Sequence, residues 1–103
     1  MVNIKQYLID EAVNEIATKE QEIKESGEEL EILSTKLKVE KKTLDMEDIK
    51  ENLKEDFKYS IQVLEDMIIM EQRKNSELKK EMEMSKYRKA VIESQFSGNE
   101  LGH

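Results

Sequence analysis

Acid–base or metal chemistry in this sequence would depend on 24 carboxylates and one histidine, because cysteine is absent. Carboxylates four residues apart, such as Glu11 with Glu15 and Glu47 with Glu51, could hold metal ions if a fold buried them beside histidine. Such pairs recur throughout a Glu-rich helix, where they usually form a solvated face. The only histidine, His103, lies in a Gly-containing tail where neither a catalytic triad nor a metal site can be assembled. We therefore expect no enzyme activity, no cofactor and no metal.

The elements that would position such residues are helices. With 103 residues the chain can form one small domain. Glu, Lys, Leu, Ala and Arg make up 48 of the 103 residues, an excess typical of long helices and coiled coils. Proline is absent and glycine occurs three times, so the turns that a β-sandwich or an alternating α/β fold needs are missing. The composition predicts an all-α fold.

Apolar residues recur every seven positions through the first half of the chain. The row is Val2, Ile9, Ile16, Ile23, Leu30, Leu37 and Leu44. A strict seven-residue repeat predicts a helix that packs lengthwise against another, as in a coiled coil. Two companion rows are open, and both are less apolar. They are Ala12, Lys19, Ser26, Leu33 and Glu40, or Val13, Glu20, Gly27, Ser34 and Lys41.

A second apolar series has the spacing of three or four residues that an amphipathic helix shows. It comprises Ile49, Leu53, Phe57, Ile61, Leu64, Ile68, Leu78, Met82, Ile92 and Phe96. Glu71 and Asn75 occupy positions of this series where apolar residues would be expected. A polar residue at such a position commonly fixes the register between helices at some cost in stability.

A chain reversal is expected between the two series. Thr43 or Asp45 could cap a second helix, with Glu47 and Asp48 in its first turn. The sequence predicts one antiparallel hairpin domain over 1–96, with helices at about 3–42 and 46–95, a turn at 43–45 and a flexible tail at 97–103. Residues 73–93 carry seven basic and four acidic groups, whereas residues 2–20 carry two and four, so opposite charges would face each other.

Two other organisations compete with the hairpin. One is a single uninterrupted helix forming a dimeric rod, since Leu44 continues the seven-residue row through the expected turn. The other is a three-helix form that breaks at Ser26-Gly27, where Ser26 and Glu29 match a capping box.

Some apolar residues lie at consecutive positions and so cannot all face one partner helix. Four successive residues, such as Met67–Met70, cover the whole circumference of a helix. We expect self-association, with two hairpins pairing into a four-helix bundle, while a different protein covering the same surface is the main alternative. The residues predicted to self-associate are Ile4, Leu8, Val63, Met67, Ile69 and Met70.

The net charge of −7 argues against direct nucleic-acid binding. Much of the acidic excess lies between residues 20 and 31, and the predicted acidic partner surface is Glu22, Glu25, Glu28 and Glu29. No apolar run is long enough to cross a membrane and no signal-peptide pattern is present, so we expect a cytoplasmic protein. Lysine outnumbers arginine 15 to 2, a bias typical of AT-rich genes such as those of low-GC bacteria or their phages.

The sequence therefore predicts a non-catalytic interaction protein: an adaptor, assembly factor or inhibitor acting as a homo-oligomer, most simply a homodimer, on an unidentified protein partner. An acidic mimic that blocks the basic groove of a nucleic-acid enzyme is the first alternative. A purely structural coiled-coil rod is the second.

Overall fold

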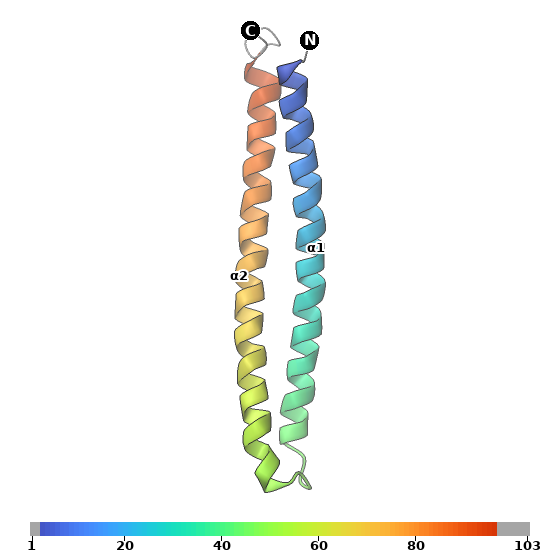
Figure 1. The fold of residues 1–103 in the computed structure, drawn as a ribbon, viewed down its shortest axis with the longest axis vertical. Coiled ribbons are helices and arrows are strands. Elements are labelled where there is room, and N and C mark those ends of the chain that lie inside the picture. The colour runs from blue at the N-terminus through green and yellow to red at the C-terminus, as the bar shows by residue number, and fades with distance from the viewer. Residues whose placement is uncertain (1–2, 97–103) are drawn as a thin grey trace. The chain divides into compact units, whose positions relative to one another are not determined.

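The chain contains two long helices. The computed structural model describes residues 3–96, in which α1 spans Ile4–Leu44 and α2 spans Glu51–Gln95 (Figure 1). The remainder of that range, chiefly the connection at 45–50, contains no strand. The all-α prediction with two helices is confirmed, because α1 passes through Ser26 and Gly27 without a break and ends before the connection. Val2 of the seven-residue row and the expected tail at 97–103 lie outside the described residues.

Local hydrogen bonds explain where α1 begins and why Thr43 remains part of it. The Asn3 carboxamide oxygen accepts the backbone N–H of Gln6 at 3.1 Å and caps the first turn. Near the other end, the Thr43 hydroxyl donates to the carbonyl of Val39 at 2.8 Å, within the helix. Thr43 therefore does not cap a second helix, and Leu44 still belongs to α1.

The second helix begins at Glu51, five residues later than the sequence indicates. Two packed helices lie about 8–10 Å apart, and the chain uses residues 45–50 to cross that distance. The first turn of α2 contains an ion pair of 2.8 Å between Glu51 and Lys54. The hydrogen bond from Lys54 holds the pKa of the Glu51 carboxyl below its usual value.

The contacts between the helices fall into two groups. We call residues up to Lys24 with those from Ser76 onward the terminal unit, and residues 25–75 the turn unit. In the turn unit Ser26 contacts Glu71 and Lys41 contacts Glu65, so the helices run antiparallel. The terminal unit is antiparallel as well, since Glu15 contacts Ser85 and Lys19 contacts Glu81.

The seam, meaning the two rows by which α1 and α2 face each other, follows the seven-residue pattern. On α1 the companion row is the one three residues after the apolar row, because Ala12, Ser26 and Leu33 are buried. The competing row is mostly exposed, including Val13 and Gly27. On α2, buried and half-buried residues alternate at intervals of three and four from Lys54 to Ile92. Polar Glu71 and Asn75 hold seam positions, as predicted, and both are half-buried.

The seam encloses a very small core. Among residues 3–96, four apolar side chains are buried: Ala12, Leu33, Leu64 and Leu78. Two paired helices bury one stripe each and leave their other sides in solvent. Within the same range, neither helix is long and apolar enough to span a membrane.

Candidate interaction surface

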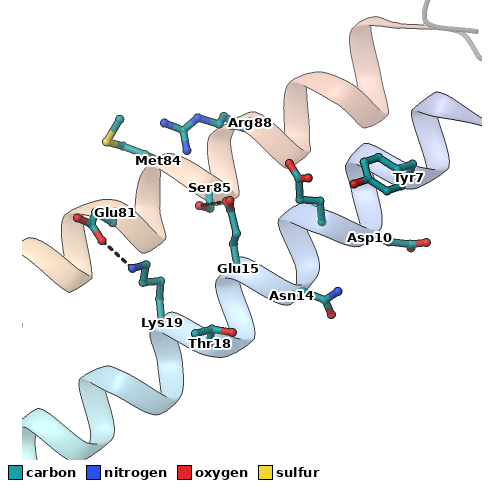
Figure 2. Close-up of a pocket in the computed structure, with 11 residues that line it drawn as sticks. Tyr7, Asp10, Asn14, Glu15, Thr18, Lys19, Glu81, Met84, Ser85 and Arg88 are labelled. Atoms are coloured by element: carbon teal, nitrogen blue, oxygen red, sulfur yellow. Dashed lines mark hydrogen bonds and ion pairs between the residues drawn. The ribbon is translucent and has the colours of Figure 1, made fainter.

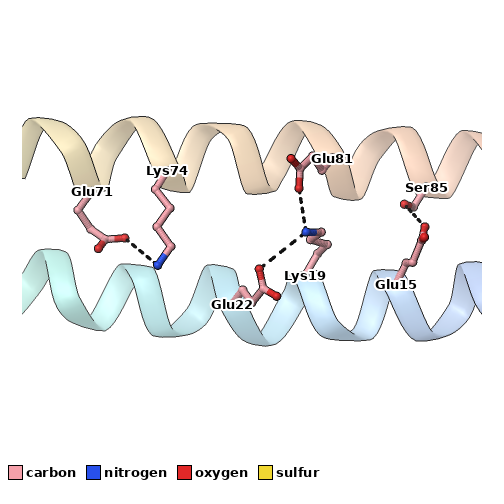
Figure 3. A network of polar contacts seen from close by, with 7 residues as sticks. All are labelled: Glu15, Lys19, Glu22, Glu71, Lys74, Glu81 and Ser85. Carbon is pink, nitrogen blue, oxygen red and sulfur yellow. Dashed lines mark hydrogen bonds and ion pairs between the residues drawn. The ribbon is translucent and has the colours of Figure 1, made fainter.

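A polar layer interrupts the seam of the turn unit. The Ser26 side chain is 2% exposed, and its hydroxyl donates to the Glu71 carboxylate at 2.7 Å. The Lys74 ammonium lies 4.0 Å from the same carboxylate (Figure 3). Serine fits here because its small side chain lets a carboxylate from the other helix reach over it. The layer thus satisfies a half-buried charge.

A matching layer occurs in the terminal unit. Ser85 is 3% exposed and its hydroxyl donates to the Glu15 carboxylate at 3.0 Å. One helical turn away, the Lys19 ammonium lies 2.8 Å from Glu81 and 3.8 Å from Glu22 (Figure 3). The hydrogen bond to Glu81 raises the pKa of Lys19 above its usual value. This cross-helix pair places the basic group on α1, opposite to the polarity that the charge totals suggested.

A groove of about 630 Å³ lies between the helices of the terminal unit. Figure 2 shows Glu15 and Ser85 joined across it, with Met84 and Arg88 along the α2 side. The Ser85 hydroxyl is buried and already donates to Glu15, so it is placed for structure rather than for nucleophilic attack. Within residues 3–96 no cluster of three or more His, Cys, Asp or Glu side chains is suited to hold a metal ion.

A second groove, of about 430 Å³, lies between the helices of the turn unit. Val39 of α1 and Val63 of α2 line it on either side, and buried Leu64 lies at its base. Residues seven apart on such helices share a face, so Ile32 continues the line of Val39 and Met70 that of Val63. We call the set the apolar flank. Its members, all exposed, are Ile32, Val39, Val63, Met67 and Met70.

The structure brings three of the predicted self-association residues together and separates the other three. Val63, Met67 and Met70 share the apolar flank, and Met70 is 68% exposed. Ile69 precedes Met70 by one residue, which is about 100° of rotation. Measured from Leu64, Ile69 falls on the other side of α2 from the flank. Ile4, which is exposed, and Leu8, which is half-buried, belong to the terminal unit.

The four predicted acidic partner residues all lie on α1. Glu22 is half-buried and contacts Lys19, in the terminal unit. The other three, Glu25, Glu28 and Glu29, are exposed in the turn unit. Glu22 pairs with Lys19, so these four carboxylates are not in equivalent surroundings.

Sequence reasoning missed two kinds of residue. Ile32 and Val39 were not predicted to be part of the surface, although both are apolar, seven residues apart and outside the seven-residue row. Ser85 was also missed, although it follows the seam residue Leu78 by seven positions. Spacing could have found all three. Comparisons with protein-family models, with curated proteins and with solved structures find no match to this chain.

Proposed function

We propose that this chain is a non-catalytic protein–protein interaction module that works as a homo-oligomeric helical bundle, with two hairpins pairing into four helices. The observation that carries the proposal is the exposure of the apolar flank beside a core of only four buried apolar side chains. Each Val, Ile or Met side chain gains about 1.5–3 kcal/mol when fully removed from water. A chain that leaves five of them exposed on one side therefore has a strong driving force for association.

Surface area supports the same proposal. The accessible surface is 7845 Å², whereas a globular monomer of this mass exposes about 6,000 Å². A standard protein interface removes about 800 Å² from each partner. The excess, about 1,800 Å², is enough for one interface of that size and leaves further surface for a different protein partner.

Methionine supports an interaction role over a purely structural one. Met67 and Met70 place flexible thioethers in the apolar flank, and such side chains adapt to irregular or exchangeable surfaces. A module of this kind would act as an adaptor, assembly factor or inhibitor by covering a surface of its partner.

The test is the absolute mass in solution, measured by light scattering over a range of concentrations. We expect twice the 12.1 kDa of one chain. A Met70→Glu variant should fall to the single-chain mass while keeping its helical circular dichroism. The matched control is Gln72→Glu, which adds the same charge at an exposed residue two positions further along α2 and should keep the doubled mass. A native chain that stays at 12.1 kDa at every concentration would refute the proposal.

A further inference from the structure

The apolar flank can accept a second copy in only a few ways, and its residues distinguish them. A two-fold axis can run parallel to the helices, so that α1 of one copy faces α2 of the other. Alternatively the axis can run perpendicular to them, so that each helix faces its own copy in the antiparallel sense. Homodimers of this kind use the same patch on both chains, so each arrangement makes definite pairs.

The contacts of the turn unit show which residues of α1 and α2 lie at the same height along the helices, that is, which residues are level with each other. Val39 and Val63 line one groove, so they are level with each other to within about one turn. Because the helices are antiparallel, moving seven residues back along α1 and seven forward along α2 keeps that level. Ile32 is thus level with Met70, and Glu29 is within about one turn of Lys74.

The axis parallel to the helices places apolar residues of one copy against apolar residues of the other. Val39 of one copy would lie against Val63 of the second, and Ile32 would lie against Met67 and Met70. At the edge of this apolar contact, Glu29 would meet Lys74 of the second copy, which is an opposite-charge pair. The Lys74 side chain is 63% exposed and its ion pair with Glu71 is long, at 4.0 Å, so its ammonium is accessible to a carboxylate of the second copy.

The perpendicular axis produces a conflict at each of the two placements that would bring Ile32 or Val39 of the two copies into apolar contact. An axis level with Ile32 sets Val39 against the carboxylate of Glu25. An axis midway between Ile32 and Val39 restores apolar contact but brings the two Lys36 ammonium groups together. Placing a charge against an apolar group or against a like charge costs free energy when water is excluded.

In the terminal unit, taken by itself, the parallel axis also gives an apolar contact and an opposite-charge pair. Its levels are set by the Glu15–Ser85 and Lys19–Glu81 contacts. On those levels, the parallel arrangement of two such units places Leu8 against Val91 and the carboxylate of Glu11 against the guanidinium of Arg88. Glu11 and Arg88 both line the groove of this unit, on the side that would face the second copy.

We propose that a second copy of this chain packs on the apolar flank about a two-fold axis parallel to the helices, with α1 of each copy facing α2 of the other. The inference rests on the proposed function, because it assigns the geometry of the homodimer. It predicts contacts between different helices of the two copies, and so a single substituted position need not meet itself.

Disulfide trapping tests this geometry, since the native chain has no cysteine. Val39→Cys and Val63→Cys are made in separate chains, mixed in equal amounts, exchanged and oxidised, so that any bond between the two positions joins two copies. A disulfide needs Cα atoms within about 7 Å, so it can form only where these two positions face each other. We expect the mixed disulfide in about half of the chains, which is the share that random exchange of two equal populations places in mixed dimers. The control mixture combines Val39→Cys with Ile69→Cys, which lies off the flank, and should give no mixed disulfide.

The outcomes separate the geometry from the proposed function. A disulfide formed by Ile32→Cys with itself would indicate the perpendicular axis and overturn the inference. So would a doubled mass by light scattering without the mixed Val39–Val63 disulfide, although that result would leave the homo-oligomer standing. A single-chain mass for the unoxidised native protein would overturn the proposed function, and the inference with it.

Discussion

The Ser26 hydroxyl donates a 2.7 Å hydrogen bond to the Glu71 carboxylate across the seam of the turn unit. Both residues occupy positions where a coiled coil normally places apolar side chains. The pair therefore sacrifices apolar contact and gains a directional bond that only one register provides. Glu15 and Ser85 form a similar bond in the terminal unit with the roles of the helices exchanged, although there the carboxylate is exposed and reaches a buried serine from beside the seam.

The Ser26–Glu71 bond predicts an unequal response to single and double substitution. Ser26→Ala should lower the free energy of unfolding by about 1–3 kcal/mol, because it leaves a half-buried carboxylate without its donor. Adding Glu71→Leu should restore and exceed the native stability, since two apolar residues then fill the layer. Urea unfolding at one protein concentration measures both effects.

The control for that series is Thr35→Ala, which removes an exposed hydroxyl that bonds the carbonyl of Glu31. It should change the free energy of unfolding by no more than about 0.5 kcal/mol. If Ser26→Ala were as stable as the native chain, the bond would contribute nothing and the layer would need another explanation.

Gly27 lies inside α1 with no strain to relieve. A Cβ added there meets nothing within 4 Å, and none of the described glycines has a positive φ. Gly27→Ala should therefore raise the free energy of unfolding by about 0.5–1 kcal/mol, and Ala17→Gly, at an exposed position of the same helix, should lower it by a similar amount. A stability loss from Gly27→Ala in thermal unfolding would favour the three-helix form with a break at Ser26.

Much of the fold follows from the sequence because it depends on spacing. The seven-residue row from Ile9 to Leu44 has one periodicity, that periodicity defines one helical face, and the structure pairs that face with α2. The place of the reversal was harder to predict. Thr43 can cap a following helix or bond back within its own helix, and local sequence does not decide between the two; the structure shows the bond back to Val39.

The candidate surface was only partly predictable. Consecutive apolar residues identify Val63, Met67, Ile69 and Met70 as a group that one partner helix cannot cover, but they do not divide the group. The division requires knowing which of them lies on the same side as α1 residues. Val39 of α1 lines a groove together with Val63 of α2, and this shows which side of α2 belongs to the flank. That information comes from tertiary contact and not from the local sequence pattern.

The α1 half of the flank can be tested separately. Val39→Glu should weaken self-association by at least about a hundred-fold, since each of the two copies then places an unpaired carboxylate in the apolar interface and one such group alone costs about 3 kcal/mol. Ile69→Glu introduces the same group off the flank and should leave the association within a few-fold of native. Sedimentation equilibrium measures both dissociation constants. If Ile69→Glu weakened association more than Val39→Glu did, the interface would lie on the Ile69 side of α2.

The Lys19–Glu81 pair predicts a change in stability at alkaline pH. The pKa of Lys19 is raised in the folded chain above its ordinary value of 10.5, by Glu81 first and also by Glu22 and Glu15. A group with a raised folded pKa stabilises the fold fully below its unfolded pKa, and this contribution is lost as the pH rises through the folded pKa. The native chain should therefore exceed Lys19→Met in stability at neutral pH and lose that advantage above pH 10.5.

Lys24→Met removes one ammonium group from an exposed position of the same helix and serves as the control. The difference in stability between the native chain and Lys24→Met should be smaller than that for Lys19→Met. It should not disappear above pH 10.5, as the difference for Lys19→Met does. Thermal unfolding recorded at several pH values on both sides of 10.5 gives the two differences. An advantage for Lys19 that persisted at the highest pH would mean that its aliphatic chain, and not its charge, stabilises the seam.

Salt distinguishes apolar association from association through the acidic residues of α1. Each copy carries a net charge of −7, so salt screens the repulsion between copies while leaving apolar contacts intact. We expect the dissociation constant to stay the same or to decrease between about 0.05 M and about 1 M NaCl. A chain with Glu22, Glu25, Glu28 and Glu29 all changed to Gln should remain a dimer, because edge contacts such as Glu29 with Lys74 contribute at most about 1 kcal/mol each. Dissociation of the native chain at high salt, or of the Gln variant at low salt, would instead assign the association to these carboxylates.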